Sequence, residues 1–219
     1  MIGLHIQSFL FMKNMSVIRK SIIVVLSILV FDQVVKIWVK THMYIGQEFP
    51  VFGKWFIVHF TENNGMAFGL EFGGGWGKIF LSLFRIAALI GIGWYIFTLS
   101  KKKVPNLLIV SLSMIMAGAL GNIIDSLFYG MIFNNSLGQI ATLFPAEGGY
   151  SYFLHGRVVD MLYFPVIQTH FPSWFPLWAS EEFVFFRPVF NIADSSITIG
   201  VFLIIAFQKK LFAHEHNSK

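Results

Sequence analysis

Long apolar runs dominate the pattern of this chain. Four of them reach the roughly 17 to 25 residues that a helix, rising about 1.5 Å per residue, needs to cross the hydrocarbon core of a bilayer. They cover residues 21–39, 79–99, 107–124 and 190–207. Each run therefore predicts a transmembrane helix, and residues 1–219 are expected to form a single integral-membrane domain.

Basic residues at the ends of these runs predict how the helices are oriented. They precede the first run, fill the turn between the second and third, and close the fourth: Lys13, Arg19, Lys20, Lys101, Lys102, Lys103, Lys209, Lys210 and Lys219. On the other side, basic residues are fewer and scattered over two long segments: Lys40, Lys54, Lys78, Arg157 and Arg187. Because positive charge is enriched on the cytoplasmic side, both termini are expected to be cytoplasmic.

The two outer segments, residues 41–77 and 126–189, are rich in aromatic residues and are expected to lie at the membrane surface. Residues 50–62, PVFGKWFIVHFTE, alternate loosely, as a half-buried pair of strands would. An irregular interfacial loop would fit this run equally well. The fold class predicted is an all-α polytopic membrane protein with four transmembrane helices, a small extracytoplasmic β-rich cradle and interfacial loops.

Composition narrows the functional classes. The chain is 56% hydrophobic, 17% aromatic and only 12% charged, with a mean hydropathy of +0.69, whereas about 25% of residues are charged in an average soluble domain. These values exclude a disordered or nucleic-acid-binding chain. With no cysteine, thiolate catalysis, cysteine-bound zinc and disulfides are excluded. The histidines lack metal-ligand spacing, and we expect neither a metal nor a cofactor.

Acidic residues occur at the outer ends of the apolar runs. A charged side chain within a bilayer costs on the order of 2.5 to 3.5 kcal/mol, so such residues call for an explanation. Asp125 ends the third run, Asp194 begins the fourth, and Asp160 lies within the apolar stretch GRVVDMLYF. Three carboxylates are therefore expected at one face of the membrane.

Other polar residues within the runs have structural interpretations. Asp32 and Lys36 are four residues apart and can form an ion pair on one helix face. Asn122 and Asp125 share a face and are expected to support a site. The small residues before them favour close helix packing: Ala117, Gly118, Ala119 and Gly121.

Arg85 lies inside the second apolar run. Its long side chain can extend to the outer headgroups, so that its charge stays at the membrane surface. The alternative is a contact with a lipid phosphate near the site.

Two carboxylates held close together share a proton at neutral pH, so that one acts as a base and the other as an acid. A water between them can then attack a peptide carbonyl without metal or covalent intermediate. Asp160 and Asp194 are the best candidates for such a pair.

A proton- or cation-coupled transporter is an alternative, disfavoured because the inner halves of the runs are almost free of acids. A lipid-binding subunit would leave the clustered carboxylates unexplained.

Five short motifs, in order, span nearly the whole chain. They are Asp32 to Lys36 as D-x-x-x-K, Asn63 to Phe68 as N-x-G-x-A-F, Gly118 to Asp125 as G-A-L-G-N-x-x-D, Gly156 to Asp160 as G-x-V-V-D, and Phe190 to Asp194 as F-N-x-A-D. Each motif is weak alone, but the series is highly specific. In this series the chain strongly resembles the lipoprotein signal peptidases, or signal peptidase II, which are integral-membrane aspartic peptidases of bacteria.

The resemblance implies a catalytic dyad of Asp160 and Asp194. It further implies that seven residues line or support the site: Asp32, Lys36, Asn63, Gly65, Asn122, Asp125 and Asn191. The implied reaction removes the signal peptide from a diacylglyceryl-modified prolipoprotein by cutting before the lipidated cysteine, at the extracytoplasmic face of the bacterial inner membrane. Membrane lipids and globomycin-type inhibitors are the other implied partners, nucleic acid is not, and a monomer is expected.

Two features depart from the family pattern. Ser126 follows Asp125 where the family often has arginine, so a salt link or substrate contact there is in doubt. Segments 131–153 and 165–187 look longer than the usual connections. We expect the two segments to form an aromatic flap over the cleft, a hypothesis suggested by Trp174, Phe175, Trp178 and Phe183.

Overall fold

The computed structural model describes residues 15–64, 74–165, 167–170, 182–185 and 188–211. Within it the chain forms two compact units. Unit 1 holds the residues up to Gln33, Phe80–Ile124 and the residues from Ile192 onward. Unit 2 holds Val34–Ile79 and Asp125–Asn191.

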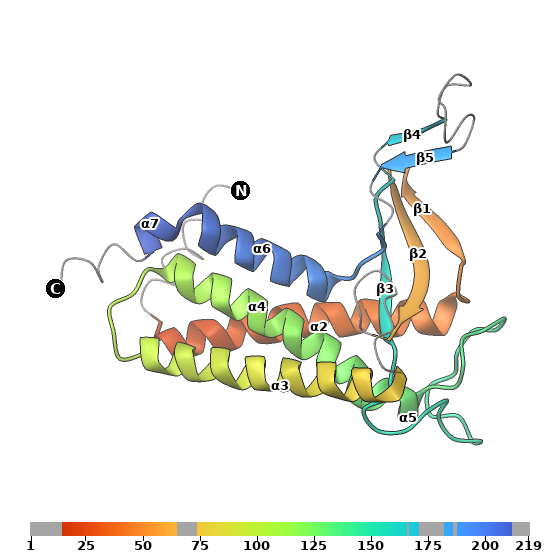
Figure 1. Ribbon diagram of the computed structural model, residues 1–219, viewed down its shortest axis with the longest axis horizontal. Helices are drawn as coiled ribbons and strands as arrows, with labels where there is room; N and C mark the ends of the chain where they lie inside the picture. Colours follow the sequence, from red (N-terminus) through yellow and green to blue (C-terminus); the bar gives the residue numbers. More distant parts are fainter. Residues whose placement is uncertain (1–14, 65–73, 166, 171–181, 186–187, 212–219) are drawn as a thin grey trace. The chain divides into compact units, whose positions relative to one another are not determined.

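Four helices account for the predicted spans (Figure 1). They are α2 (Val17–His42), α3 (Gly74–Leu99), α4 (Asn106–Ile124) and α6 (Ile192–Ala206). The first three are long and apolar enough to cross a membrane, whereas α6 is shorter and is followed by the single turn α7 (Gln208–Leu211). Helices form here because a backbone surrounded by lipid must satisfy its hydrogen bonds within itself. The fold is therefore that of a helical membrane protein.

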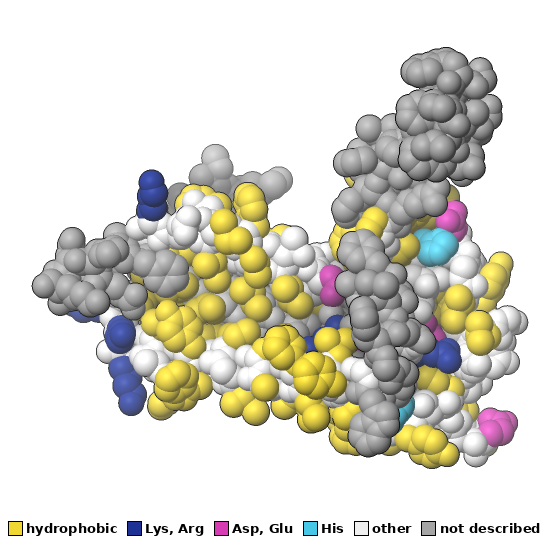
Figure 2. Space-filling view, in the orientation of Figure 1, with side chains coloured by type: hydrophobic (Ala, Val, Ile, Leu, Met, Phe, Trp, Pro, Cys, Tyr) yellow, Lys and Arg dark blue, Asp and Glu magenta, His cyan; other side chains and the backbone are white. Residues whose placement is uncertain are grey.

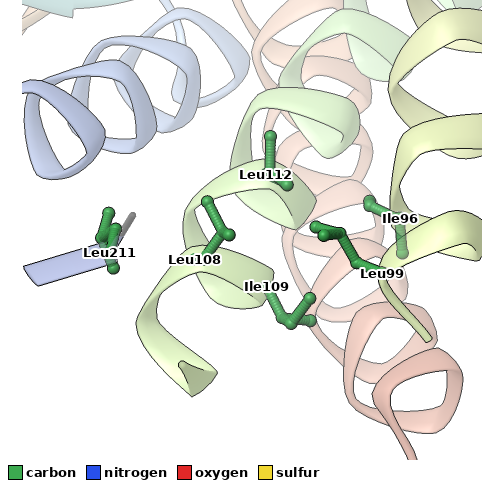
Figure 3. Close-up of a cluster of buried hydrophobic side chains, with 6 residues drawn as sticks. All are labelled: Ile96, Leu99, Leu108, Ile109, Leu112 and Leu211. Atoms are coloured by element: carbon green, nitrogen blue, oxygen red, sulfur yellow. The ribbon is translucent and has the colours of Figure 1, made fainter. Parts of the chain in front are cut away.

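In unit 1, α4 is the central helix and packs against α2, α3 and α6. Residues in its first half form a buried apolar cluster with α3 and α7, drawn in Figure 3: Ile96, Leu99, Leu108, Ile109, Leu112 and Leu211. Helix α2 is joined to α4 by polar contacts, since Ser113 donates to Ser21 over 2.8 Å and Lys20 donates to Asn106 over 2.7 Å. The start of α2, the α3–α4 turn and α7 thus lie at one end of the unit.

Helices α4 and α6 approach so closely that only glycine fits at their contact. A Cβ added to Gly118 would overlap the carbonyl oxygen of Ala193 and lie 2.7 Å from Ile197. At Gly200 on α6, an added Cβ would lie 2.7 Å from the carbonyl oxygen of Ser111. The predicted packing role of the small residues in α4 is confirmed for Gly118.

Unit 2 is built around a small antiparallel sheet in the order β1-β2-β3. Its strands are β1 (Glu48–Phe52), β2 (Phe56–Asn63) and β3 (Val158–Tyr163). The strand pair suggested by residues 50–62 is confirmed, and the irregular-loop alternative is wrong. The third strand joins from far along the chain and carries Asp160. A second hairpin pairs β4 (Ile167–His170) with β5 (Glu182–Phe185).

After α4 the chain continues as a π-helical turn, η2 (Asp125–Tyr129), and then a short helix, α5 (Gly130–Ile132). Single π-helical turns are frequent at functional sites because they redirect side chains within a helix. Here the turn begins at Asp125. Helix α5 leads into the predicted long segment 131–153, whose Tyr150 and Ser151 amides donate to the carbonyls of Phe133 and Gly130 over 2.9 and 2.8 Å.

Candidate active site

Asp160, in unit 2, is 2% exposed and lies on β3 between buried valines and methionine. Both of its carboxylate oxygens accept hydrogen bonds from side-chain amides. Asn63, at the end of β2, donates to Oδ2, and Asn191 donates to Oδ1 over 2.6 Å. The two donors come from segments on either side of β3, so they hold the carboxylate in one orientation. Sequence analysis predicted all three residues in the site, and the structure brings them together.

Asp194, in unit 1, lies in the first turn of α6 and is only partly buried. The amide of Asn122, near the end of α4, donates to its Oδ1 over 2.7 Å. A carboxylate in the first turn of a helix is also stabilised by the helix dipole. Asn122 therefore holds the Asp194 carboxylate, and its expected support of a site stays a prediction.

Lys36 and Asp125 form a buried ion pair in unit 2. Lys36 Nζ lies 2.8 Å from Asp125 Oδ2, and both side chains are fully buried. The same oxygen accepts the backbone N–H of Val159 over 3.3 Å. Asp125 therefore connects the second half of α2 to β3, one residue before Asp160.

Gly156 allows the segment before β3 to pass close to the backbone of Asp125 and Ser126. A Cβ added there would overlap the carbonyl oxygen of Asp125, and the Gly156 amide donates to the carbonyl of Ser126 over 2.9 Å. The glycine of the G-x-V-V-D motif is thus required by a close backbone approach. Position 126 contributes its carbonyl oxygen to this contact.

Asp32, in unit 1, is 1% exposed and accepts the backbone N–H of Ala193 on Oδ1 over 2.9 Å. This N–H belongs to the first turn of α6, where backbone donors have no partner within the helix. A Cβ added to Gly121 would lie 2.7 Å from Asp32 Oδ2. Asp32 therefore anchors the start of α6, and its predicted ion pair with Lys36 stays a prediction.

Several predicted residues have other outcomes. Gly65 and the flap residues Trp174, Phe175 and Trp178 lie outside the described residues, as does the side chain of Phe183. Asn122 and Asp125 were expected to share one helix face and to support a site. In the structure Asn122 donates to Asp194, whereas Asp125 pairs with Lys36 and accepts the Val159 N–H at the start of the π-helical turn.

Sequence analysis missed a buried polar cluster in unit 2 centred on Glu62. The Glu62 carboxylate, whose side chain is 2% exposed, accepts from Lys40 and from Ser136, the latter over 3.0 Å. Arg157 donates to its other oxygen over 3.3 Å. Lys40 and Ser136 are themselves fully buried and 2.8 Å apart. The sequence feature that could have indicated this cluster is the acidic residue Glu62, which directly precedes the motif residue Asn63.

Tyr150 closes this cluster. Its hydroxyl accepts the backbone N–H of Arg157 over 2.6 Å, and its ring lies beneath both Lys40 Nζ and the Arg157 guanidinium, each 5.1 Å from the ring centroid. Burial raises the pKa of Tyr150 above its usual range, so the phenol stays neutral. The predicted long segment 131–153 thus contributes Ser136 and Tyr150 to the interior of unit 2.

Comparison with known proteins agrees with the motif series. The family model described as signal peptidase (SPase) II, peptidase family A8, matches residues 24–209. The lipoprotein signal peptidase of Porphyromonas gingivalis is 58% identical over 182 residues, which are 81% of this chain and 77% of that protein. The lipoprotein signal peptidase of Amoebophilus asiaticus is 40% identical over 179 residues, 80% of this chain and 72% of that protein.

Solved structures agree as well. Two bacterial membrane enzyme structures, determined by the in meso method at 2.3 and 1.9 Å resolution, superpose with TM-scores of 0.56 and 0.55 at 29% and 30% identity. They cover 86% and 85% of this chain, and this chain covers 87% and 90% of theirs. With a family model matched along most of its length and a relative at 58% identity, the chain belongs to the signal peptidase II family, the A8 family of aspartic peptidases that cleave signal peptides from prolipoproteins.

Proposed function

We propose that Asp160 and Asp194 are the catalytic dyad of this peptidase. The observation that carries the proposal is the distribution of amide donors. The asparagines of three motifs donate to these two carboxylates: Asn63 and Asn191 to Asp160, and Asn122 to Asp194. The remaining motif acids are engaged differently. Asp32 accepts a helix N–H and the side-chain amide of its own neighbour Gln33, and Asp125 is paired with Lys36.

In this mechanism one carboxylate takes a proton from water as the water oxygen attacks the scissile carbonyl. The other, protonated, donates a hydrogen bond to the carbonyl oxygen as it gains negative charge. Collapse of the tetrahedral intermediate breaks the C–N bond, and the departing amine takes a proton from the dyad. The products are a signal peptide with a new carboxylate and a lipidated cysteine with a free α-amine. Asn63, Asn122 and Asn191 hold the acids in position throughout.

The substrate is proposed to be a diacylglyceryl-modified prolipoprotein, cut immediately before the lipidated cysteine. Its acyl chains would stay in the bilayer while the peptide reaches the carboxylates. The proposed orientation places both termini in the cytoplasm and the dyad at the extracytoplasmic face of the bacterial inner membrane. The chain is proposed to act as a monomer, with membrane lipids around it and no nucleic acid or cofactor.

Unit 1 supports that orientation. Except for Arg85 within α3, its described Lys and Arg side chains gather at the end that holds the α3–α4 turn and α7, and its lateral surface is largely apolar (Figure 2). Asn122 and Asp194 lie at the other ends of their helices, away from this basic end, and Asp32, past the middle of α2, contacts the start of α6. We propose four crossings, the fourth made by α6 and α7 together, because residues 192–211 rise about 30 Å when helical.

The test is the pair of variants Asp160→Asn and Asp194→Asn, purified in detergent and incubated with a lipidated prolipoprotein. Each should lose cleavage at least about 1,000-fold while keeping the wild-type unfolding temperature, because a neutral amide cannot act as the acid or base. Wild-type cleavage should proceed in a metal chelator and stop with globomycin. Glu147→Gln makes the same chemical change on an exposed loop residue and should leave turnover unchanged. Near-normal turnover in either aspartate variant would remove that residue from the dyad.

A further inference from the structure

The cluster centred on Glu62 has no part in the mechanism above. Yet it places charged side chains in a buried environment, which requires that each be paired. Its members come from four segments of unit 2: Lys40 from the last turn of α2, Glu62 from β2, Ser136 and Tyr150 from segment 131–153, and Arg157 from the residue before β3.

The pairing of β2 with β3 places this cluster and Asp160 on opposite faces of the two strands. In β2 and β3 the paired residues are Thr61 with Asp160, Glu62 with Val159, and Asn63 with Val158. Successive side chains of a strand point to opposite faces, and paired residues share a face. Asn63 and Asp160 therefore lie on one face of the strand pair.

Glu62 lies on the opposite face of the same strand pair. Arg157, three residues before Asp160, shares that face, and the two side chains meet as a diagonal cross-strand pair at 3.3 Å. The strand pair thus has a face that carries Asp160 and a face that carries the charge cluster.

We infer that Glu62 is a positioning residue for the peptidase reaction. Its carboxylate joins the end of β2 to Lys40 and Ser136, and joins β2 to the start of β3 through Arg157. Those contacts fix the height and tilt of β2 relative to β3 at the residues that carry the Asn63–Asp160 hydrogen bond. Glu62 touches neither substrate nor water in this role. It acts through Asn63.

Segment 131–153 holds the contacts of Glu62 with Lys40 and Ser136 in place. The Ser136 carbonyl accepts the Ile45 amide over 3.4 Å, and the Ala141 amide donates to the Lys40 carbonyl over 3.3 Å. Ser136 is therefore held against the end of α2 by backbone contacts on both sides, and it presents its hydroxyl to Glu62. This gives the segment a function in support of the site.

The inference rests on the proposed role of Asp160, and its test is a double-mutant cycle. Glu62→Gln keeps the shape of the side chain but removes its charge. In the wild-type background it should lower kcat for a lipidated prolipoprotein peptide about tenfold and leave KM within about twofold, since small misplacement of a catalytic group lowers the rate steeply. In the Asn63→Ala background the same substitution should lower kcat less than twofold, because the bond that it positions is already absent.

Equal losses of kcat in the two backgrounds would overturn the inference, as would an unchanged kcat or an effect confined to KM. Those results would not contradict the proposed dyad, because the dyad is tested separately by Asp160→Asn and Asp194→Asn. Glu48→Gln is the matched control: Glu48 also lies on the sheet and pairs with His59 at 2.8 Å, but at an exposed position. It should change neither constant.

A milder variant covers the case in which Glu62→Gln does not fold in detergent. Ser136→Ala removes one donor to Glu62 and leaves all charges in place. It should lower kcat two- to threefold in the wild-type background and not at all with Asn63→Ala, at an unchanged unfolding temperature. An unchanged kcat in Ser136→Ala would then overturn the inference.

Discussion

The acids of this protein differ in how they are held. Asp160 and Asp194 accept from neutral amides, whereas Asp125 accepts from a buried ammonium group. An amide fixes orientation without adding a charge, so it leaves a carboxylate free to exchange protons. A buried lysine instead places an opposite charge directly against its partner, as in a structural ion pair. This contrast separates the proposed reacting acids from the structural one.

Tyr150 predicts a stability effect at alkaline pH. Because burial raises the pKa of Tyr150, the folded state holds the phenolic proton more tightly than the unfolded state, whose tyrosine pKa is near 10. Its contribution to stability is therefore complete below pH 10 and is lost as pH rises above that value. The unfolding temperature of the wild type should fall above pH 10, and Tyr150→Phe should fall less steeply.

The measurement is thermal unfolding of both proteins in detergent from pH 8 to 11. At pH 8, Tyr150→Phe should be the less stable protein by about 1 kcal/mol, because the Arg157 amide loses its acceptor. The difference should narrow as pH rises. Parallel curves for the two proteins would contradict the assignment.

Which of these residue contacts could be predicted from sequence depends on chain separation. Asp160 and Asp194 stood out because acids in apolar surroundings are costly, and the motif series named their asparagine partners. Lys40 and Arg157 were instead counted among scattered outer charges, and Glu62 was seen only as the end of an alternating run. Their mutual contacts join residues 22 and 95 positions apart, and no local pattern reports such pairings.

At the scale of elements, the contact between α4 and α6 sets the position of Asp194. Gly118 faces the Ala193 carbonyl, one residue before Asp194. Gly118→Ala should force the helices apart and cost about 1 to 3 kcal/mol of unfolding free energy, the usual penalty for overpacking a core. Turnover should fall as well, because the start of α6 would shift.

Gly91→Ala is the control for this prediction. Gly91 lies in α3, and an added Cβ there would meet nothing within 4 Å. Since alanine favours helix more than glycine does, this variant should be as stable as the wild type or slightly more so. Unfolding in denaturant, monitored by circular dichroism, compares the two. Equal stability of Gly118→Ala and Gly91→Ala would show that the α4–α6 contact is looser than described.

Elements differ in how well sequence predicted them. The apolar runs located α2, α3 and α4, whose bounds enclose the predicted spans, and loose alternation located β1 and β2. Strand β3 was missed as a strand because VVDMLY is buried along nearly its whole length and shows no alternation. The π-helical turn also escaped prediction, since its residues DSLFY differ in no obvious way from those of an ordinary helix.

For the whole molecule, the absence of native cysteine makes orientation directly testable. Lys102→Cys, in the α3–α4 turn, and Glu147→Cys, in segment 131–153, each introduce a single exposed thiol. In intact cells a membrane-impermeant maleimide should label only the Glu147→Cys protein, and it should label both after permeabilisation. Labelling of Lys102→Cys in intact cells would reverse the proposed topology.

Side chains along β2 and β3 alternate between two faces, and this alternation determines where the protein can accept inserted residues. One extra residue between Thr61 and Glu62 would turn the asparagine to the opposite face of the strand and bring the Glu62 carboxylate toward Asp160 in its place. The turn between β1 and β2, at Gly53 and Lys54, precedes the residues whose register matters, and both of its residues are exposed. Epitope tags, fluorophore-labelling peptides and natural indels should therefore be accepted at this turn and rejected a few residues later.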